Sequence, residues 1–245
     1  MNDWSGKTIL VTGASSGIGR ATAQRLLESG ARVVAVARST ARLDDLRAGE
    51  GMLHRVELDL LDLAGFASVV EGLPELDGVV HSAGIVLVRP VAFFSLKHHQ
   101  RVIDTNLTAP MALTGELLRR HKIRHGASLV FVSSINGNAL GVKGCSTYAA
   151  SKAGLVGAAR VFALELAAQS IRVTCVLPGA VEGPMNDSLS HVSDEDRRSE
   201  ATAYPLGERF ARPDEIASTI LFLLSAESSF VTGQTLIVDG GCSVQ

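Results

Sequence analysis

The stretch Thr8-Ile9-Leu10-Val11-Thr12-Gly13-Ala14-Ser15-Ser16-Gly17-Ile18-Gly19 decides the fold. Its apolar first part predicts a buried strand, and the glycines after it predict a tight turn into a helix that begins near Ile18. Backbone N–H groups and the positive end of that helix would face an anion at the turn. Glycines let a pyrophosphate approach the main chain, and the Ser15 and Ser16 hydroxyls add donors. Because the spacing is not G-x-G-x-x-G, a purely structural turn is the alternative interpretation.

Short apolar runs alternate with stretches of helical periodicity along the rest of the chain. The runs that predict strands are Thr8–Thr12, Arg32–Ala37, Val56–Asp59, Gly78–Ser82, Leu129–Ser133, Val173–Leu177 and Leu236–Val238. The stretches that predict helices are Ile18–Ser29, Ala41–Arg47, Leu63–Gly72, Leu96–His121, Tyr148–Gln169 and Asp214–Leu224. Because the strands are apolar on both faces and alternate with helices, the fold class predicted is α/β with a doubly wound parallel sheet. Ligands bind to such sheets beyond the carboxyl ends of the strands.

Size and composition fit a single domain over residues 1–245. The chain has 245 residues, of which 46% are hydrophobic and 20% charged, and its formal net charge is −2. This balance argues against a nucleic-acid partner. The polar start lacks the apolar core of a secretory signal, and no apolar run reaches the roughly 18 residues that cross a bilayer. We therefore expect a cytoplasmic protein without a membrane partner.

Neither cysteine nor histidine spacing predicts a metal site or a disulfide framework. Cys145, Cys175 and Cys242 are odd in number and far apart, and only His98 and His99 are adjacent in the sequence. Neighbouring residues on a helix point in different directions, so this pair does not converge on one metal ion. We expect reduced thiols and no metal.

The segment 182–205 is polar and charged, unlike the rest of the chain. We interpret it as a mobile insertion that forms a lid over the substrate. A solvated surface helix without a role is the alternative.

The end of the second predicted strand bears on the choice of cofactor. That position lies beside an adenosine ribose, where a carboxylate would bind free hydroxyls and an arginine would pair with a 2′-phosphate. The strand ends in Val36-Ala37-Arg38-Ser39, with a cation and no acid. NADP(H) is therefore favoured over NAD(H), unless Arg38 is simply an exposed residue at a helix start.

Tyr148 and Lys152 are four residues apart at the start of a predicted helix, so their side chains share one helical face. A phenol has a pKa near 10, and a nearby ammonium would favour the phenolate. The pair is a candidate acid/base. Ser134, at the end of the fifth predicted strand, could offer a hydroxyl to a polarised carbonyl oxygen.

Together these residues resemble the short-chain dehydrogenases/reductases over nearly the whole chain. Thr12–Gly19 looks like the family's cofactor turn, and Tyr148-Ala149-Ala150-Ser151-Lys152 looks like its Tyr-x-x-x-Lys motif. The resemblance implies a Rossmann-like three-layer sandwich with a mostly parallel seven-stranded sheet. The remaining residues that it places at the cofactor are Asp59, Leu60, Ser82, Ala83, Gly84, Pro178, Gly179 and Val181.

The resemblance also implies a role for each catalytic residue. Tyr148 would exchange a proton with the carbonyl or alcohol oxygen while Ser134 holds that oxygen. Lys152 would hold the nicotinamide ribose and depress the Tyr148 pKa, and Asn106 would anchor a water that relays protons to Lys152. Hydride would pass between NADP(H) and the substrate carbon, so the chain would mainly orient and polarise the reactants.

Three departures from the family pattern stand out. His81-Ser82-Ala83-Gly84 replaces the common Asn-Asn-Ala-Gly, and Gly183 stands where a threonine often binds the carboxamide. Ser134 precedes Tyr148 by one residue more than usual, which predicts a small insertion around Asn136–Val142. His81 has two interpretations: a strand-end histidine satisfied by nearby backbone, or a proton shuttle.

Three function classes compete. The first is an oxidoreductase for a carbonyl or secondary alcohol, with a hydrophobic substrate indicated by Leu87, Leu140, Val142, Met185 and Leu189. The second is a catalytically silent NAD(P)-binding regulatory or scaffold protein. The third is an epimerase or dehydratase, which the short carboxyl-terminal part disfavours. Because the helix Tyr148–Gln169 is apolar nearly all round, a homo-oligomer is expected, and the resemblance suggests a tetramer.

Overall fold

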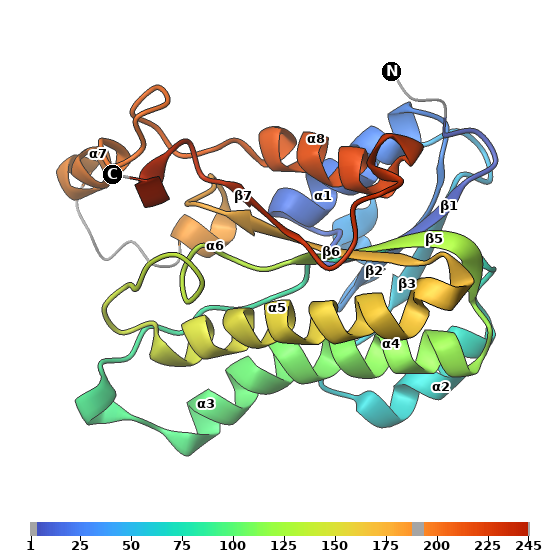
Figure 1. Cartoon of the computed structure of the whole chain (residues 1–245), viewed down its shortest axis with the longest axis horizontal. Coiled ribbons are helices and arrows are strands. Elements are labelled where there is room, and N and C mark those ends of the chain that lie inside the picture. The colour runs from blue at the N-terminus through green and yellow to red at the C-terminus, as the bar shows by residue number, and fades with distance from the viewer. Residues whose placement is uncertain (1–3, 188–193, 245) are drawn as a thin grey trace.

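A computed structural model describes residues 4–187 and 194–244. Its centre is a seven-stranded sheet in the order β3-β2-β1-β4-β5-β6-β7 (Figure 1). Every pair of neighbouring strands is parallel. The strands are β1 (Thr8–Thr12), β2 (Arg32–Ala37), β3 (Leu53–Glu57), β4 (Leu76–His81), β5 (Ile123–Val132), β6 (Arg172–Pro178) and β7 (Thr235–Val238). The prediction of a doubly wound α/β fold is confirmed.

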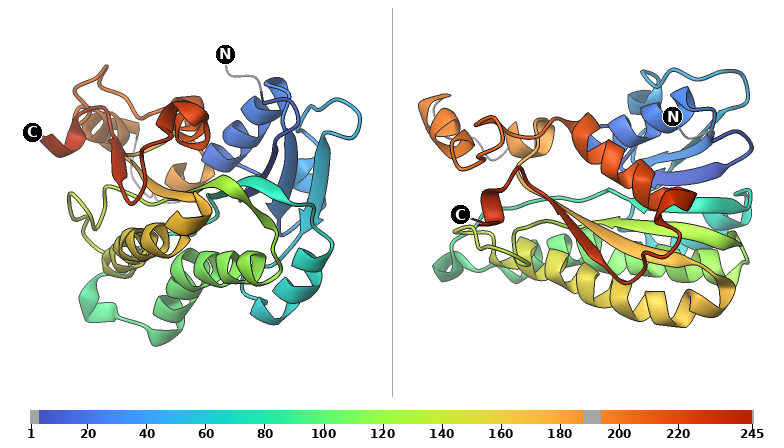
Figure 2. Two further views of the ribbon diagram at one scale, coloured as in Figure 1. Left: turned by 45° about the vertical axis from the view of Figure 1, so that its right-hand side comes forward. Right: turned by 45° about the horizontal axis from the view of Figure 1, so that its top comes forward.

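Helices cover both faces of the sheet (Figures 1 and 2). One face carries α1 (Gly17–Glu28) and α8 (Pro213–Leu224). The other face carries α2 (Phe66–Glu71), α3 (Leu96–Ile103), α4 (Ala109–Arg119) and α5 (Ser146–Leu166). Two further helices, α6 (Pro184–Asp187) and α7 (Asp194–Ala201), lie beyond the carboxyl ends of the strands.

Side chains of the central strands alternate between two cores. On β1, Leu10 packs into the core under α2, α4 and α5, whereas Ile9 and Val11 pack into the core under α1 and α8. This period of two is the reason that strands apolar on both faces are buried at the centre of the sheet. The chain reverses its direction of winding between β1 and β4, and such a switch point is where a ligand crevice opens.

The predicted helix Ala41–Arg47 is wrong. Only one 3₁₀ turn forms there, over Thr40–Leu43. Leu43 and Leu46 are the buried residues of this connection, and glycines at 49 and 51 follow at once. Two apolar anchors are too few to hold a longer helix against the sheet.

Several other elements differ from their predicted bounds, among them β5, which begins at Ile123 rather than Leu129. The third strand begins at Leu53 rather than Val56, because β3 is an edge strand in which only Val56 is buried, so no apolar run marks its start. The predicted helix Leu96–His121 contains a π-helical turn at Asp104–Thr108 between α3 and α4. None of the helices in the described ranges is long and apolar enough to span a membrane.

His81, at the end of β4, is buried inside the core and does not line the large cavity described below. Its Nε2 lies 2.9 Å from Thr114 Oγ1, which itself donates to the Pro110 carbonyl at 2.8 Å, so the imidazole donates to the threonine. The ring stacks on Phe131 with the centroids 4.7 Å apart. Burial lowers the pKa of His81 to about 3. His81 is therefore a neutral packing residue satisfied by a side chain, and the proton-shuttle interpretation is wrong.

Stability should depend on pH through His81. The native pKa of about 3 lies below the ordinary value of 6.5, so the contribution is complete above pH 6.5 and is lost as the pH falls toward 3. Lowering the pH from about 7.5 to about 5.5 should remove about 1.4 kcal/mol of unfolding free energy, because only the unfolded chain gains this proton. Urea denaturation at both pH values measures this loss in the wild type and in His81→Asn. The loss of unfolding free energy should be about 1.4 kcal/mol smaller in the asparagine variant. Equal losses in the two proteins would contradict the assignment.

Candidate active site

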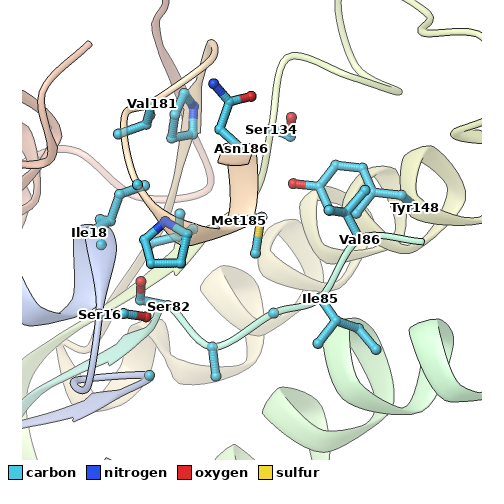
Figure 3. A pocket seen from close by; sticks show the side chains of 18 of the residues that line it. Ser16, Ile18, Ser82, Ile85, Val86, Ser134, Tyr148, Val181, Met185 and Asn186 are labelled. Atoms are coloured by element: carbon cyan, nitrogen blue, oxygen red, sulfur yellow. The ribbon is translucent and has the colours of Figure 1, made fainter. Parts of the chain in front are cut away.

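A cavity of about 570 Å³ opens beyond the carboxyl ends of the strands. It runs from Arg38 at the end of β2, past the β1 turn, to Tyr148 at the start of α5. Figure 3 shows side chains from the turn, from the segment after β4 and from α6 around this space. Of the residues predicted for the site, those that line the cavity are Gly13, Ser15, Ser16, Gly17, Ile18, Arg38, Asp59, Leu60, Ser82, Ala83, Gly84, Ser134, Tyr148, Lys152, Pro178, Gly179 and Val181.

The turn after β1 needs its glycines for close contact. Gly13 has φ +70°, and a Cβ there would lie 2.8 Å from the Ala83 Cα. A Cβ on Gly19 would collide with the Gly13 carbonyl oxygen, so Gly19 supports the turn from below and does not line the cavity. Ser16 precedes α1 and makes no capping hydrogen bond, which leaves its hydroxyl and the first N–H groups of the helix for a ligand.

The segment after β4 is fixed against this turn. Thr12 Oγ1 accepts hydrogen bonds from the N–H groups of Ser82 at 3.1 Å and Ala83 at 3.2 Å. A Cβ on Gly84 would lie 3.4 Å from the Lys152 Nζ, so glycine keeps the approach to this ammonium open. The chain thus brings the glycine-rich β1 turn and Lys152 to one cavity, although its sequence after β4 departs from the family pattern.

Tyr148 and Lys152 converge, as their spacing predicts. The Lys152 Nζ lies 5.8 Å from the centroid of the Tyr148 ring and donates to the Val132 carbonyl at 2.8 Å. Lys152 is 3% exposed, and burial lowers its pKa to about 8. Ser134 Oγ accepts from the Asn136 N–H at 3.1 Å and is near enough to the Tyr148 hydroxyl to lower its pKa.

The expected depression of the Tyr148 pKa by Lys152 is not found. Burial is the largest influence and raises the pKa of Tyr148 to about 12, while the nearby Ser134 hydroxyl lowers it and the neighbouring Cys145 raises it. The ammonium lies over the ring and is engaged by the Val132 carbonyl. The phenol is therefore protonated at neutral pH, which is the form that donates a proton.

Asn106 is fully buried in the π-helical turn, and its side chain does not line the cavity. Its Nδ2 donates to the Ile85 carbonyl at 2.9 Å and to Ser151 Oγ at 3.1 Å, and its Oδ1 accepts from the Ile85 N–H at 2.8 Å. Through these hydrogen bonds the Asn106 side chain links the segment after β4 to α5. The water relay implied by the resemblance stays a prediction.

The chain after β6 closes the other side of the cavity. A Cβ on Gly179 would lie 2.8 Å from the Tyr204 ring, and the Ala180 N–H donates to Tyr204 Oη at 2.9 Å. Gly183, in place of the usual threonine, has φ +128°, and a Cβ there would lie 4.0 Å from the Gly17 Cα. A threonine would be strained in this conformation, so the glycine fits the path of the chain over the turn.

Residues 182–205 contain α6 and α7, and 188–193 lie outside the described residues. Of the apolar positions expected at the substrate, Leu140, Val142 and Met185 line the cavity. Leu87 instead lines a separate small depression beside Phe94. Leu189 lies outside the described residues. The lid stays a prediction.

Sequence reasoning missed several lining residues, among them Arg42, Asn136 and Asn186. Arg42 follows Arg38 by four residues, and this spacing could have predicted a second arginine at the same end of the cavity. The predicted insertion contains Gly137 at φ +91°, where a Cβ would collide with the Ala149 backbone, so the extra residue folds into a tight turn against α5. In the described ranges, no three His, Cys, Asp or Glu side chains come together as metal ligands.

Comparisons with known proteins agree with this geometry. The family model described as enoyl-(acyl carrier protein) reductase matches residues 13–243. A 3-oxoacyl-(acyl-carrier-protein) reductase of Thermotoga maritima is 38% identical over 244 residues, which cover 96% of this chain and 97% of the relative. The Escherichia coli protein of the same name is 36% identical and covers 98% of each chain.

Solved structures match over the whole fold. A Brucella melitensis protein titled short-chain dehydrogenase/reductase, glucose/ribitol dehydrogenase, superposes with a TM-score of 0.90 at 31% identity, with 98% of each chain covered. The Thermoplasma acidophilum aldohexose dehydrogenase gives 0.87 at 27% identity, with 99% of this chain and 96% of that chain covered. The fold and the site define an NAD(P)-dependent oxidoreductase that acts on carbonyl or alcohol groups. The chain belongs to the short-chain dehydrogenase/reductase family.

Replacing Tyr148 by phenylalanine should reduce kcat for carbonyl reduction by about 10²–10⁴-fold, because the proton donor is lost while the ring still packs. Steady-state oxidation of NADPH or NADH measures this, with binding of the same cofactor by fluorescence as the check on the fold. The chain's other described tyrosine gives a matched control: Tyr204→Phe removes an acceptor for one backbone N–H and should cost less than about tenfold. Comparable losses in both variants would contradict the role of Tyr148.

Proposed function

We propose that this protein is an NADP(H)-dependent reductase of ketones, working with Ser134, Tyr148 and Lys152 as its catalytic groups. The observation that carries the proposal is their arrangement: two neighbouring hydroxyls and a buried ammonium line one cavity together with the glycine-rich β1 turn. The glycines at 13 and 84 let the β1 turn, the segment after β4 and Lys152 approach one another closely. The cavity of about 570 Å³ that they line reaches from Arg38 to Tyr148, which suits an extended dinucleotide. When bound, NADPH supplies the hydride for the carbonyl carbon.

The chain's own part is to orient the substrate and to move a proton. Ser134 Oγ–H would donate to the substrate oxygen and hold it beside Tyr148. The Tyr148 hydroxyl, protonated because burial raises its pKa to about 12, would give its proton to that oxygen as negative charge develops. The Lys152 ammonium has donors beyond the one that binds Val132, and these would hold ribose hydroxyls.

Two arginines support the choice of NADP(H). Arg38 and Arg42 both line the end of the cavity by β2, and neither makes an ion pair within residues 4–187 and 194–244. Asp59 nearby accepts from the Leu61 N–H at 3.0 Å and so organises its own loop. Two free guanidinium groups suit the 2′-phosphate that distinguishes NADP from NAD.

A silent NAD(P)-binding regulator is the alternative function. Such a protein has no chemical need for a buried lysine beside a tyrosine, because burying an ammonium without a carboxylate is costly. The retention of Lys152 together with Ser134 and Tyr148 favours the enzyme.

The substrate we propose has an aliphatic part. Ile85, Val86, Leu140, Val142 and Met185 give the cavity an apolar wall near Tyr148. The names of the two sequence relatives make a 3-oxoacyl thioester one compound to test. We place the enzyme in the cytoplasm on the grounds of the sequence.

We also propose a homo-oligomer, most simply a tetramer. Leu164 of α5 is 80% exposed and Val161 is half exposed on the same helix, and Met111 of α4, a helix on the same face of the sheet, is also exposed. The edge strand β7, which neighbours the strand β6 that α5 packs on, exposes Leu236 and Ile237. An exposed apolar helix face and an exposed apolar sheet edge suit two kinds of contact between copies, as a tetramer requires.

Removing the arginine pair should change cofactor choice. Arg38→Gln and Arg42→Gln should each weaken NADPH binding by at least about tenfold, because each loses a charge-assisted hydrogen bond, and should change NADH binding much less. Titration of both cofactors measures the ratio. Arg55→Gln, which removes an arginine of β3 paired with Asp44, is the matched control. Equal weakening of NADPH and NADH, or a wild type that prefers NADH, would contradict the proposal.

The oligomer can be tested by light scattering after size exclusion. The wild type should have four times the 25.7 kDa chain mass. Leu164→Glu should give a smaller species, since it places a charge in an apolar contact. Leu63→Glu, at an exposed leucine away from α5, should leave the mass unchanged. A monomeric wild type would refute the proposal.

A further inference from the structure

Two asparagine carboxamides lie in the wall of the cavity near the catalytic hydroxyls and have no part in the reduction described above. Asn136 follows Ser134 by two residues, and its N–H donates to Ser134 Oγ at 3.1 Å. Asn186 belongs to α6. Both line the cavity, and Figure 3 shows Asn186, Ser134 and the Tyr148 hydroxyl around the same part of it.

The side-chain oxygen of Asn136 accepts no hydrogen bond from the residues that the structure describes. The residue is 7% exposed, and its Oδ1 is buried without a partner. The same carboxamide lies beside the Cys145 thiol, whose pKa burial raises and the carboxamide lowers. An unpaired buried amide oxygen costs free energy and is uncommon in native structures. Because χ2 of asparagine turns easily, Oδ1 can rotate toward a donor that a ligand brings into the cavity.

Asn186 contributes the complementary group. Its side chain is partly buried and makes no hydrogen bond to the described residues, so its NH₂ group is available as a donor to the cavity. A simple ketone has one polar atom, the carbonyl oxygen, which Ser134 and Tyr148 bind. A hydroxyl group on the substrate can donate to Asn136 Oδ1 and accept from Asn186 Nδ2, and so satisfies both asparagines.

We propose that Asn136 and Asn186 bind a hydroxyl group close to the reacting carbonyl, so that the preferred substrates are hydroxyketones with an aliphatic remainder. This inference rests on the proposed function. In the reaction the carbonyl carbon gains hydride from NADPH, the carbonyl oxygen gains a proton from Tyr148, and the substrate hydroxyl is unchanged, which yields a diol and NADP⁺. The two asparagines determine specificity and take no part in the chemistry.

The test compares acetoin with butanone, which differ by one hydroxyl. NADPH-dependent kcat/KM is measured on both ketones for the wild type, Asn136→Leu, Asn186→Leu and Asn138→Leu. Asn138 is the matched control: it donates to the Ser134 carbonyl at 2.9 Å in the same loop but does not line the cavity. A hydroxyl next to a carbonyl makes the ketone more reactive by itself. This effect is the same for every variant, so it drops out when the ratio of kcat/KM for acetoin to kcat/KM for butanone is compared between proteins.

Asn136→Leu and Asn186→Leu should each lower kcat/KM for acetoin by about tenfold, the size expected for one lost hydrogen bond, and should leave kcat/KM for butanone unchanged. Asn138→Leu should change both ketones alike. If Asn136→Leu does not fold, Asn186→Leu decides, because its site on a short surface helix tolerates the change. Unchanged ratios in a protein that reduces both ketones would overturn the inference and leave the proposed function standing. A wild type that reduces neither ketone, with NADPH bound, would overturn both.

Discussion

The burial of the Lys152 ammonium at the end of β5 is the interaction on which the site depends. The Val132 carbonyl accepts from Nζ at 2.8 Å, and Ser133 Oγ donates to the Lys152 carbonyl at 2.7 Å, so α5 is fixed to the strand at both ends of this residue. Burial lowers the pKa of Lys152 to about 8, and the neighbouring Cys175 opposes this shift. A cation held this way, with no carboxylate of residues 4–187 or 194–244 paired with it, is prepared for the oxygen atoms of a ligand.

Glycines at three positions determine how closely the chain segments around the channel can approach one another. These glycines lie where chain segments of the site come close together. A Cβ would meet the Ala83 backbone at Gly13, the Lys152 ammonium at Gly84 and the Tyr204 ring at Gly179. Backbone can therefore come close to a bound dinucleotide along its length. Parallel strands bring these connections to one edge of the sheet, which is why residues 13, 84, 148 and 179 meet although they are far apart in the chain.

Much of this arrangement could be predicted from the sequence, because it follows local rules. The β1 turn, the ends of the central strands and the four-residue spacing of Tyr148 and Lys152 need only periodicity and sheet topology. What failed depends on tertiary contacts. The helix expected at Ala41–Arg47 lacked anchors, the partner of His81 comes from α4, and the burial that raises the Tyr148 pKa is set by the whole cavity. Asn186 gave no signal, since one polar residue in a charged segment looks like its neighbours.

A crystal structure of the complex with NADP⁺ would test the central claim most directly. The account predicts ribose hydroxyls within hydrogen-bond distance of Lys152 Nζ, the nicotinamide ring beside Ser134 and Tyr148, and the 2′-phosphate between Arg38 and Arg42. A dinucleotide bound outside this channel, or a complex in which Tyr148 and Lys152 face different spaces, would contradict it.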